Sequence, residues 1–420
     1  MYKDKILLEV NKQLKEIPDQ QKNKVKNLLN LKQDELLDEI QKKVFNYFWE
    51  EADEITGLIK DRKSKDSYAS IAATGFGLTV IPAAVNRGWL EEKKGFNRIL
   101  STLRAIDQIV DGKNGFYYHF VDSSNGNRSR QCELSSIDTA LLLAGALFAG
   151  QYYKNTEIEE LADKLYRKAN WSWMLNSGET LCMGWTPEQG FEEARWDHFD
   201  EGLLAYILGI GAPHYTLSTN SWHQIKRPVK NNRIYLPSEP LFIYLYPQVW
   251  VDFRNKKDDY VNYWENTKKA VYYNYSFCKK KKNQYKTYSK DIWGLSACDG
   301  PDGYHAYGAV EGNHDGTIAP YAALSSLPYE PKLSFNFIRT ALDIYGPLIW
   351  GKYGFVSGFN LDKGWFSKDY IGIDQGTLFL MIENYRSSLI WKYFMRNNYI
   401  KKAMKKIGFR KQKEKDNDPN

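Results

Sequence analysis

Residues 195–213, RWDHFDEGLLAYILGIGAP, join a cluster of ionisable side chains to an apolar segment. The acids and the histidine all lie before residue 202, and nearly every residue from 203 to 213 is apolar. A helix that is apolar on most of its faces lies inside a protein and is surrounded by other elements. This stretch therefore predicts an inner helix over 199–210 with acidic groups at its start.

Helix capping explains part of this acidic cluster. Asp197 can accept the backbone N–H three residues on, and Asp200 then lies in the first turn, where the helix dipole favours acids. Capping does not account for Glu201, which lies against Leu203 and Leu204 and is expected to be partly desolvated. Such a carboxyl group has a raised pKa and can hold a proton at neutral pH. Glu201 is therefore a candidate general acid.

Similar helical patterns recur along the rest of the chain, separated by turns. They predict helices over 36–53, 69–86, 94–110, 135–153, 156–175, 199–210, 239–247, 258–280, 317–326, 332–346 and 374–396. Residues 114–131 instead predict a β-hairpin that turns at Asn125-Gly126. Because no linker rich in Pro, Gly or Ser interrupts the helices, we expect one all-α domain, with the apolar helices inside. An inner ring of helices wrapped by an outer ring is an (α/α)6 barrel, a toroid whose loops at one mouth carry function.

The ends of the chain differ from this pattern. Residues 1–35 are polar and predict an N-terminal extension, residues 36–398 the barrel, and residues 399–420 a basic, flexible tail. The first residues lack the apolar segment of a signal peptide, and no run is long enough to span a bilayer. We therefore expect a cytoplasmic protein without a membrane span, acting as a monomer.

Charge and cysteine content exclude several classes of partner. The net charge of +7 comes largely from the run 279–282 and from the C-terminal stretch, and such runs are usually solvated surface, so nucleic acid is not expected. The four cysteines have no paired spacing typical of a metal site and are expected to be reduced thiols. The acidic turn Gly-Pro-Asp-Gly is compatible with a calcium loop, but the EF-hand spacing is absent. No metal and no cofactor are predicted.

Acidic and aromatic residues gather in the long loops and at helix starts. The chain has 13 Trp, 30 Tyr and 20 Phe. Such a high aromatic content is typical of a groove in which side chains stack on sugar rings. Alternatively, Tyr simply replaces other apolar residues because the organism's proteins are rich in Lys, Asn and Tyr. The residues expected to bind substrate are Trp185, Trp196, His198, Trp293, Asp299, Asp302, Tyr304, His305, Trp365, Asp374, Gln375, Glu383 and Arg386.

Glycoside cleavage needs two carboxyl groups, one protonated and one ionised. Asp138, at the start of the apolar helix 135–153, is the candidate partner of Glu201, although a capping box with Ser135 would also explain it. A toroid can bring both acids to one mouth. We expect Asp138, Glu201, Asp299, Trp293, Trp365 and Asp374 to line that mouth.

The order of these motifs resembles the bacterial glucoamylase-like family, which includes the endo-β-1,2-glucanases of glycoside hydrolase family 144. The resemblance runs over about residues 40–397. Besides 195–213, it rests on SIAATGFGL (70–78), SSIDTALLLAG (135–145), EPLFIYLYPQVWVDFR (239–254), ACDGPDGY (297–304), DGTIAPYAALSSLPYEP (315–331), WGKYGFVSGFN (350–360), WFSKDYIGIDQG (365–376) and MIENYRSSLIWKYF (381–394).

This resemblance implies an (α/α)6 barrel that hydrolyses β-glucans or their oligosaccharides, particularly β-1,2-linked ones. The acidic positions of the family fall on Asp138 and Glu201. Its members are usually secreted or lipid-anchored, whereas no leader is recognised in these residues. Two alternatives stay open: a phosphorylase or transglycosylase on the same barrel, and a glucan-binding protein without catalytic activity.

Overall fold

A computed structural model describes residues 10–309 and 311–412 of the chain. The fold is all-α, with short strands that pair in twos and threes between the helices. The helices are α2 (Asp19–Leu29), α3 (Gln33–Glu50), α4 (Ile71–Asn86), α5 (Glu92–Gln108), α6 (Ser136–Tyr152), α7 (Glu157–Lys168), α8 (Leu203–Gly211), α9 (Thr219–His223), α10 (Phe242–Trp250), α11 (Tyr263–Lys281), α12 (Pro320–Ser325), α13 (Pro331–Ile349), α14 (Gly372–Ser387), α15 (Leu389–Phe394) and α16 (Asn398–Ile407).

The inner helices are those whose sequences are apolar on all faces. Every residue of α8 is buried, as is nearly every residue of α4, α6 and α14. Helix α4 packs against both α6 and α14, and α6 also packs against α8. Helices α4 and α6 approach so closely that a Cβ atom on Gly145 would overlap the carbonyl oxygen of Gly75. Glycine at these positions therefore sets the spacing of the inner helices.

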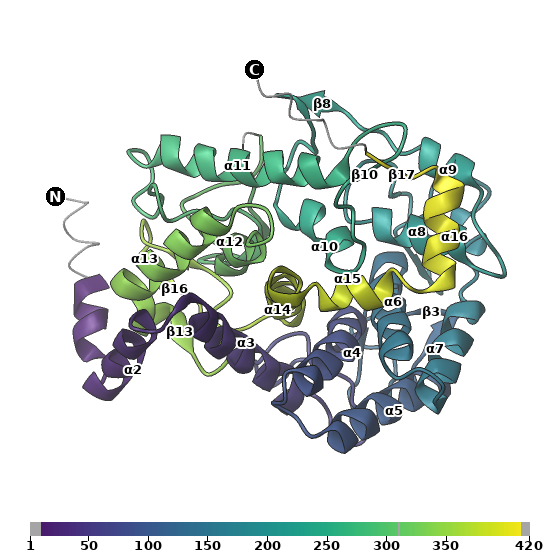
Figure 1. Cartoon of the computed structure of the whole chain (residues 1–420), viewed down its shortest axis with the longest axis horizontal. Helices are drawn as coiled ribbons and strands as arrows, with labels where there is room; N and C mark the ends of the chain where they lie inside the picture. The colour runs from purple at the N-terminus through teal and green to yellow at the C-terminus, as the bar shows by residue number, and fades with distance from the viewer. Residues whose placement is uncertain (1–9, 310, 413–420) are drawn as a thin grey trace.

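The outer helices are amphipathic and bury one face each. In α7, Ile158, Ala162, Leu165 and Tyr166 are buried at helical spacing, while the opposite side carries charged residues. Figure 1 shows the chain running around the molecule, from α3 and α5 at the bottom, past α7 on the right and α11 at the top, to α13 on the left. Helix α14 then brings the chain to the centre, where it packs against α3, α4 and α12.

Most of the predicted helices are confirmed, with ends that differ by a few residues. The predicted helix 156–175 ends at Lys168, and the predicted helix 374–396 is two helices, α14 and α15, because Ser388 between them has positive φ. The predicted inner helix 199–210 begins later, at Leu203, because the preceding residues form the turn that holds the acids. The predicted hairpin is only partly correct. Strands β2 (Gly112–Lys113) and β3 (Phe116–Tyr117) pair around Asn114 and Gly115, both at positive φ. Gly126 also has positive φ and donates to the carbonyl of Asp122, but only an isolated bridge between Val121 and Arg128 closes that second turn.

The terminal segments are more ordered than their composition suggested. Helix α2, within the predicted extension, packs against α13. The prediction of a flexible tail is wrong for residues 399–411, because α16 buries Ile400, Ala403, Met404 and Ile407 against the body, and β17 (Arg410–Lys411) pairs with β10 (Lys256–Lys257). Residues 1–9 of the extension and 413–420 of the tail lie outside the described residues. The domain boundaries themselves stay a prediction.

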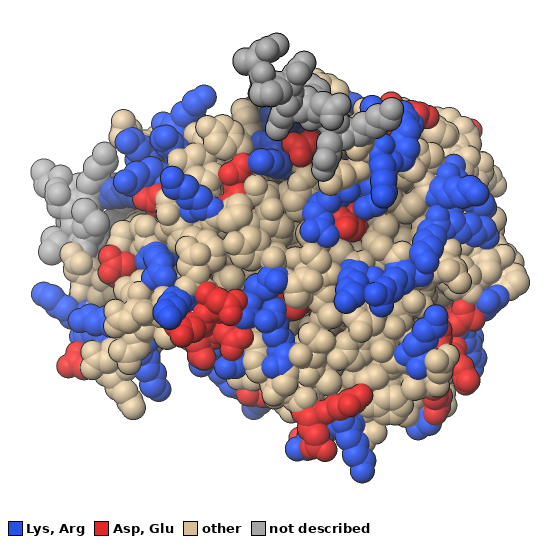
Figure 2. Space-filling view, viewed as in Figure 1, with Lys and Arg blue, Asp and Glu red and all other residues tan. Residues whose placement is uncertain are grey.

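The surface charge and the length and hydrophobicity of the helices indicate whether nucleic acid or a membrane is a partner. On the face shown in Figure 2, Lys and Arg side chains are interspersed with acidic groups rather than gathered in one patch. Within residues 10–412, residue 310 apart, none of the helices is both long enough and apolar enough to cross a bilayer. All four cysteines are free thiols.

Candidate active site

Acidic residues from distant parts of the chain meet where the inner helices begin. Asp138 lies in the first turn of α6, Glu201 directly before α8, and Asp374 in the first turn of α14. Asp61 lies in the loop before β1 (Ala69–Ser70), and Asp299 lies on β11 (Ala297–Gly300). We call these five residues the carboxylate cluster.

The charges of several of these residues act on one another. The charge of Asp138 adds to the rise that burial causes in the pKa of Glu201, and it also acts on Asp61. Burial raises the pKa of Asp374 well above its usual range, and the charges of Asp299 and Asp61 raise it further. The structure thus brings together four acids that the sequence analysis singled out, and it adds Asp61.

Glu201, like Asp61, is a partly buried acid of the cluster. Burial raises its pKa to about 7. A large fraction of Glu201 is therefore protonated at neutral pH. The neighbouring Asp200 is buried and accepts the backbone N–H of Gly202 at 2.9 Å, so it shapes the turn before α8. The expected cap by Asp197 is wrong, because its carboxylate binds His198 at 2.6 Å and Lys226 at 2.7 Å, and α8 has no side-chain cap.

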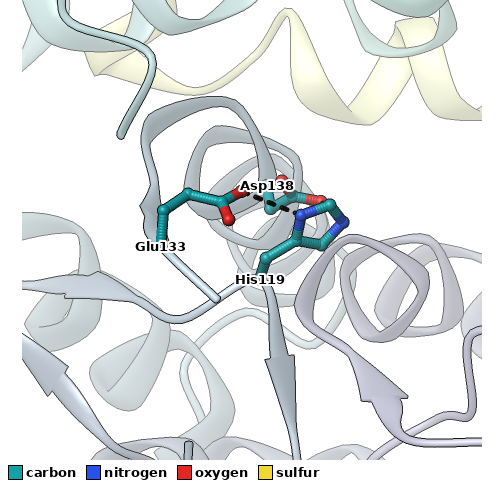
Figure 3. Close-up of side chains that lie close together, drawn as sticks. All are labelled: His119, Glu133 and Asp138. Atoms are coloured by element: carbon teal, nitrogen blue, oxygen red, sulfur yellow. Dashed lines mark hydrogen bonds and ion pairs between the residues drawn. The ribbon is translucent and has the colours of Figure 1, made fainter. Parts of the chain in front are cut away.

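Asp138 is held by a serine and faces a histidine. Ser135 caps α6 by accepting the N–H of Asp138 at 3.1 Å, and its hydroxyl donates to Asp138 Oδ2 at 2.5 Å. The other carboxylate oxygen, Oδ1, lies 3.6 Å from His119 Nε2. His119 Nδ1 lies 2.9 Å from Glu133 Oε1. Figure 3 shows both carboxylates pointing toward the imidazole ring.

His119 is positively charged in this setting. Burial by itself would lower its pKa, but the charge of Asp138 and the charge and hydrogen bond of Glu133 raise the pKa to about 9. The ligand atoms of His119, Glu133 and Asp138 lie within 4.8 Å of one another, a spacing that a metal ion could use. However, each ring nitrogen faces a different carboxylate. This is the geometry of an imidazolium between two anions rather than of three ligands around one ion.

Asp374 is the deepest carboxyl group of the cluster. Its residue is 1 % exposed, and neither carboxylate oxygen has a hydrogen-bond partner among the described residues. A buried polar group without a partner is costly and is often retained for function. Arg62 lies nearby, and its Nη1 lies 3.2 Å from Asp299 and 3.6 Å from Asp369. Asp374 is therefore free to contact a ligand, whereas Asp299 is already paired.

Tyrosines complete this side of the cluster. Tyr304, on β12 (Gly303–Ala306), is 47 % exposed as a residue, yet burial of its hydroxyl end and the charge of Asp374 raise its pKa well above the usual range. The pKa of Tyr246 and that of Tyr321 are raised in the same way, by burial first and then by Asp374. All three phenol groups are therefore near enough to Asp374 to be affected by its charge.

Several residues predicted to bind substrate lie elsewhere, and these predictions are wrong. Trp293 is fully buried and packs edge-on against Tyr275, so no sugar can stack on it. Glu383 is fully buried and binds Arg87 at 2.8 and 3.0 Å. Arg386 binds Asp34, Asp38 and Gln41. Gln375, by contrast, adjoins Asp374 in the first turn of α14; its amide donates to the carbonyl of Phe355, its Oε1 has no partner among the described residues, and its role in binding stays a prediction. Glu383 lies nine residues along α14 from Asp374, a rise of about 14 Å.

The remaining predicted residues lie nearer to the surface or in the loops. Trp196 is buried, and its indole donates to Ser136 at the start of α6. Trp185 is partly exposed on β6 (Gly184–Thr186), with the Lys113 ammonium 4.1 Å from its ring. His198 and Trp365 are partly exposed, and Asp302 and His305 are exposed on the β11–β12 hairpin. Whether these residues bind sugar stays a prediction.

Sequence reasoning missed Asp61, Arg62, His119 and Glu133. Asp61 and Arg62 lie in an ordinary polar loop, KDRKSKD, that resembles any solvated turn. His119 lies in the aromatic run FYYHF, which we interpreted only as a strand pattern. The single imidazole of His119 among the aromatic residues of this run could have indicated a functional residue.

Comparisons with known proteins show which family and which folds the chain resembles. Residues 193–398 match the model of a family described as "Putative glucoamylase". The chain is 31 % identical to a "putative glucoamylase" from Bacteroides uniformis, with a TM-score of 0.86 over 91 % of this chain and 98 % of that one. It is 27 % identical to an endo-β-1,2-glucanase from Chitinophaga pinensis in complex with sophorotriose and glucose, with a TM-score of 0.85 over 90 % and 99 %.

One curated relative is an exo β-1,2-glucooligosaccharide sophorohydrolase acting at the non-reducing end, from Parabacteroides distasonis. It is 28 % identical over 417 residues, which cover 89 % of this chain. The chain spans 58 % of the length of that relative.

Proposed function

The chain belongs to the glucoamylase-like family, and from this premise we propose that it is a glycoside hydrolase acting on β-1,2-linked glucan or β-1,2-gluco-oligosaccharides. The relatives whose names state a substrate act on this linkage. We propose that the inner and outer helices form a closed (α/α)6 barrel, which would hold the carboxylate cluster at one end of the inner ring. The packing of α14 against α4 supports this closure.

The observation that carries the proposal is that Asp138 lies close enough to Glu201 for its charge to raise the pKa of the buried Glu201 carboxyl group further. Glycoside hydrolysis needs one carboxyl group that delivers a proton to the leaving oxygen and another that acts as an anion. With a pKa of about 7, Glu201 is protonated in a large fraction of the molecules at neutral pH and can still release its proton readily to the leaving oxygen. Asp138 Oδ1 lies 3.6 Å from His119 Nε2 and supplies the second carboxyl group.

We assign the proton transfer to Glu201 and the ionised role to Asp138. Asp374, whose oxygens have no partner among the described residues, then binds the attacking water or a sugar hydroxyl. Tyr304, with its ring exposed and its hydroxyl near Asp374, offers a surface on which a sugar ring can stack.

Phosphorolysis is the less favoured alternative. A phosphate ion needs an unpaired positive charge, yet Arg62 faces Asp61, Asp299 and Asp369. His119 lies between two carboxylates in the same way. Both positive groups of the site are therefore neutralised, and the surrounding carboxylates repel phosphate.

The test is digestion of β-1,2-, β-1,3-, β-1,4- and α-1,4-linked glucans, with and without inorganic phosphate, followed by sizing of the products. We expect shorter oligosaccharides from the β-1,2-linked glucan without phosphate. Release of disaccharide alone would indicate exo action, and a range of sizes endo action. Absence of β-1,2 cleavage, or cleavage that requires phosphate, would overturn the proposal.

A further inference from the structure

We propose that the hollow between the N-terminal segment (residues 10–18) and the loop 364–368 binds further sugar units of a β-1,2-linked glucan chain that is held at the carboxylate cluster. The inference rests on the proposed hydrolase function and deepens it, because it gives the enzyme a preference for longer chains. In this site Trp365 is the surface on which a sugar ring stacks, and Glu16 accepts hydrogen bonds from sugar hydroxyls.

Two segments that are far apart in sequence form the walls of the hollow. One wall is the N-terminal segment, of which residues 10–16 are helical, and the other contains β16 (Trp365–Phe366). Gln13 joins the walls, because its Nε2 donates to the carbonyl of Gly364 at 3.1 Å. Figure 1 shows the start of the described chain, in purple, on the same side of the molecule as β16. The volume of about 660 Å³ lies in the range of small-molecule sites.

The indole of Trp365 is available for stacking inside this hollow. Strand β16 pairs with β15 (Phe359–Asn360), and successive side chains of a strand point to opposite faces. Of the two residues of β16, only Phe366 packs against the core, where its ring stacks on Phe359. Among the described residues, no aromatic ring and no cation lies against Trp365, which is partly exposed. Its free face can therefore take a sugar ring.

The charged groups of the hollow favour a neutral, polar ligand. Glu16 and Lys368 line the hollow from opposite walls, and both are exposed. Neither side chain forms a hydrogen bond or an ion pair with another residue of the described part of the chain. Sugar hydroxyls both donate and accept, so they can bind a carboxylate and an ammonium group at once. Because the two charges cancel, a strongly charged ligand of either sign gains little here.

The hollow adjoins the carboxylate cluster along the loop that forms its second wall. Ser367 lines the hollow, and its hydroxyl donates to Asp299 Oδ2 at 3.5 Å. Two residues further on, Asp369 lies 3.6 Å from Arg62 Nη1. Trp365 precedes Ser367 by two residues, about 7 Å of extended backbone. A glucan chain held at the cluster therefore has only a short distance to cover before it reaches Trp365.

Calorimetry tests the binding directly, on the Glu201→Gln chain so that the glucan stays intact. Adding Trp365→Ala should weaken the binding of a long linear β-1,2-glucan about tenfold, because one aromatic stacking contact is lost. The same change should weaken the binding of the β-1,2-linked disaccharide less than about twofold. Adding Glu16→Ala should weaken the binding of the long glucan about threefold. Unchanged affinity for the long glucan in both variants would overturn the inference.

Kinetics on chains that keep Glu201 give a second readout. The ratio of kcat/KM for the long glucan to kcat/KM for the β-1,2-linked trisaccharide should fall about tenfold in Trp365→Ala and about threefold in Glu16→Ala. Two controls should leave the ratio unchanged: Tyr272→Ala, a 56 % exposed ring on α11 outside the hollow, and Glu54→Ala, an exposed acid outside it. A folded Trp365→Ala enzyme with an unmoved ratio would contradict the proposed site.

The two experiments separate this inference from the function itself. If the wild type cleaves β-1,2-glucan and neither variant changes the dependence on chain length, the hydrolase proposal stands and the site falls. If the glucan binds through Trp365 and is not cleaved by the wild type, the hydrolase proposal falls and the site stands. If Trp365→Ala does not fold, Glu16→Ala carries both measurements, because this exposed side chain has no partner to lose among the described residues.

Discussion

Replacement of Glu201 by Gln should make the protein more stable at alkaline pH and nearly inactive. Folding moves the pKa of this carboxyl group from 4.5 to about 7. The folded protein therefore binds more protons than the unfolded chain between pH 4.5 and 7, and its stability falls as the pH rises through this window. The displacement corresponds to about 3 kcal/mol at pH 8. Gln cannot ionise, so the variant avoids this cost.

The assay combines urea unfolding with hydrolysis of a β-1,2-linked glucan. At pH 8, the unfolding free energy of Glu201→Gln should exceed that of the wild type by up to about 3 kcal/mol, and below pH 4.5 the two should agree. Activity should fall by at least about 100-fold, the lower limit for loss of a general acid. Glu54→Gln, which changes an exposed acid, is the control and should alter neither quantity.

Two outcomes would refute this reasoning. A variant that is less stable than the wild type at pH 8 would show that the carboxylate form of Glu201 is favoured by the fold, which contradicts the raised pKa. A stable variant that still cleaves the glucan at the wild-type rate would remove Glu201 from the mechanism, even if its pKa is as described.

Three further substitutions separate the site from the scaffold. Asp374→Asn should lose at least about 100-fold in activity and gain stability at pH 8, because burial raises the pKa of this acid well above its usual range, as it does for Glu201; unchanged turnover would contradict its contact with substrate. Glu383→Gln should show the opposite pattern, with kcat/KM retained and about 3 kcal/mol of stability lost in urea melts, because Arg87 loses its charged partner. Arg62→Lys should lower kcat/KM about tenfold, since one hydrogen bond to a charged group contributes about 1.5 kcal/mol or more; a wild-type rate would show that the Arg62–Asp299 contact does not position the site.

The fold could be predicted from sequence because its inner helices have an unmistakable pattern. Helices such as α4 and α6 are apolar on every face, and this is possible only for elements that others surround. Glu201 was identifiable for a related reason, since an acid that adjoins such a helix must be partly desolvated.

The rest of the site depended on contacts that no local pattern contains. Glu383 and Asp374 belong to the same helix and look alike in sequence, yet one is paired with Arg87 and the other has no partner among the described residues. Trp293 resembled a sugar platform, but an aromatic residue in a loop can equally fill the core. His119 became visible only when the fold placed it between two carboxylates.

The most direct test of the central claim is the pH dependence of kcat/KM for a β-1,2-linked gluco-oligosaccharide. This quantity reports the ionisation of essential groups in the free enzyme. We predict hydrolysis with an alkaline limb at an apparent pKa of about 7, where Glu201 loses its proton. A rate that stays constant from pH 6 to about 9 would contradict the assignment of Glu201 as the acid, because proton donation requires the protonated form.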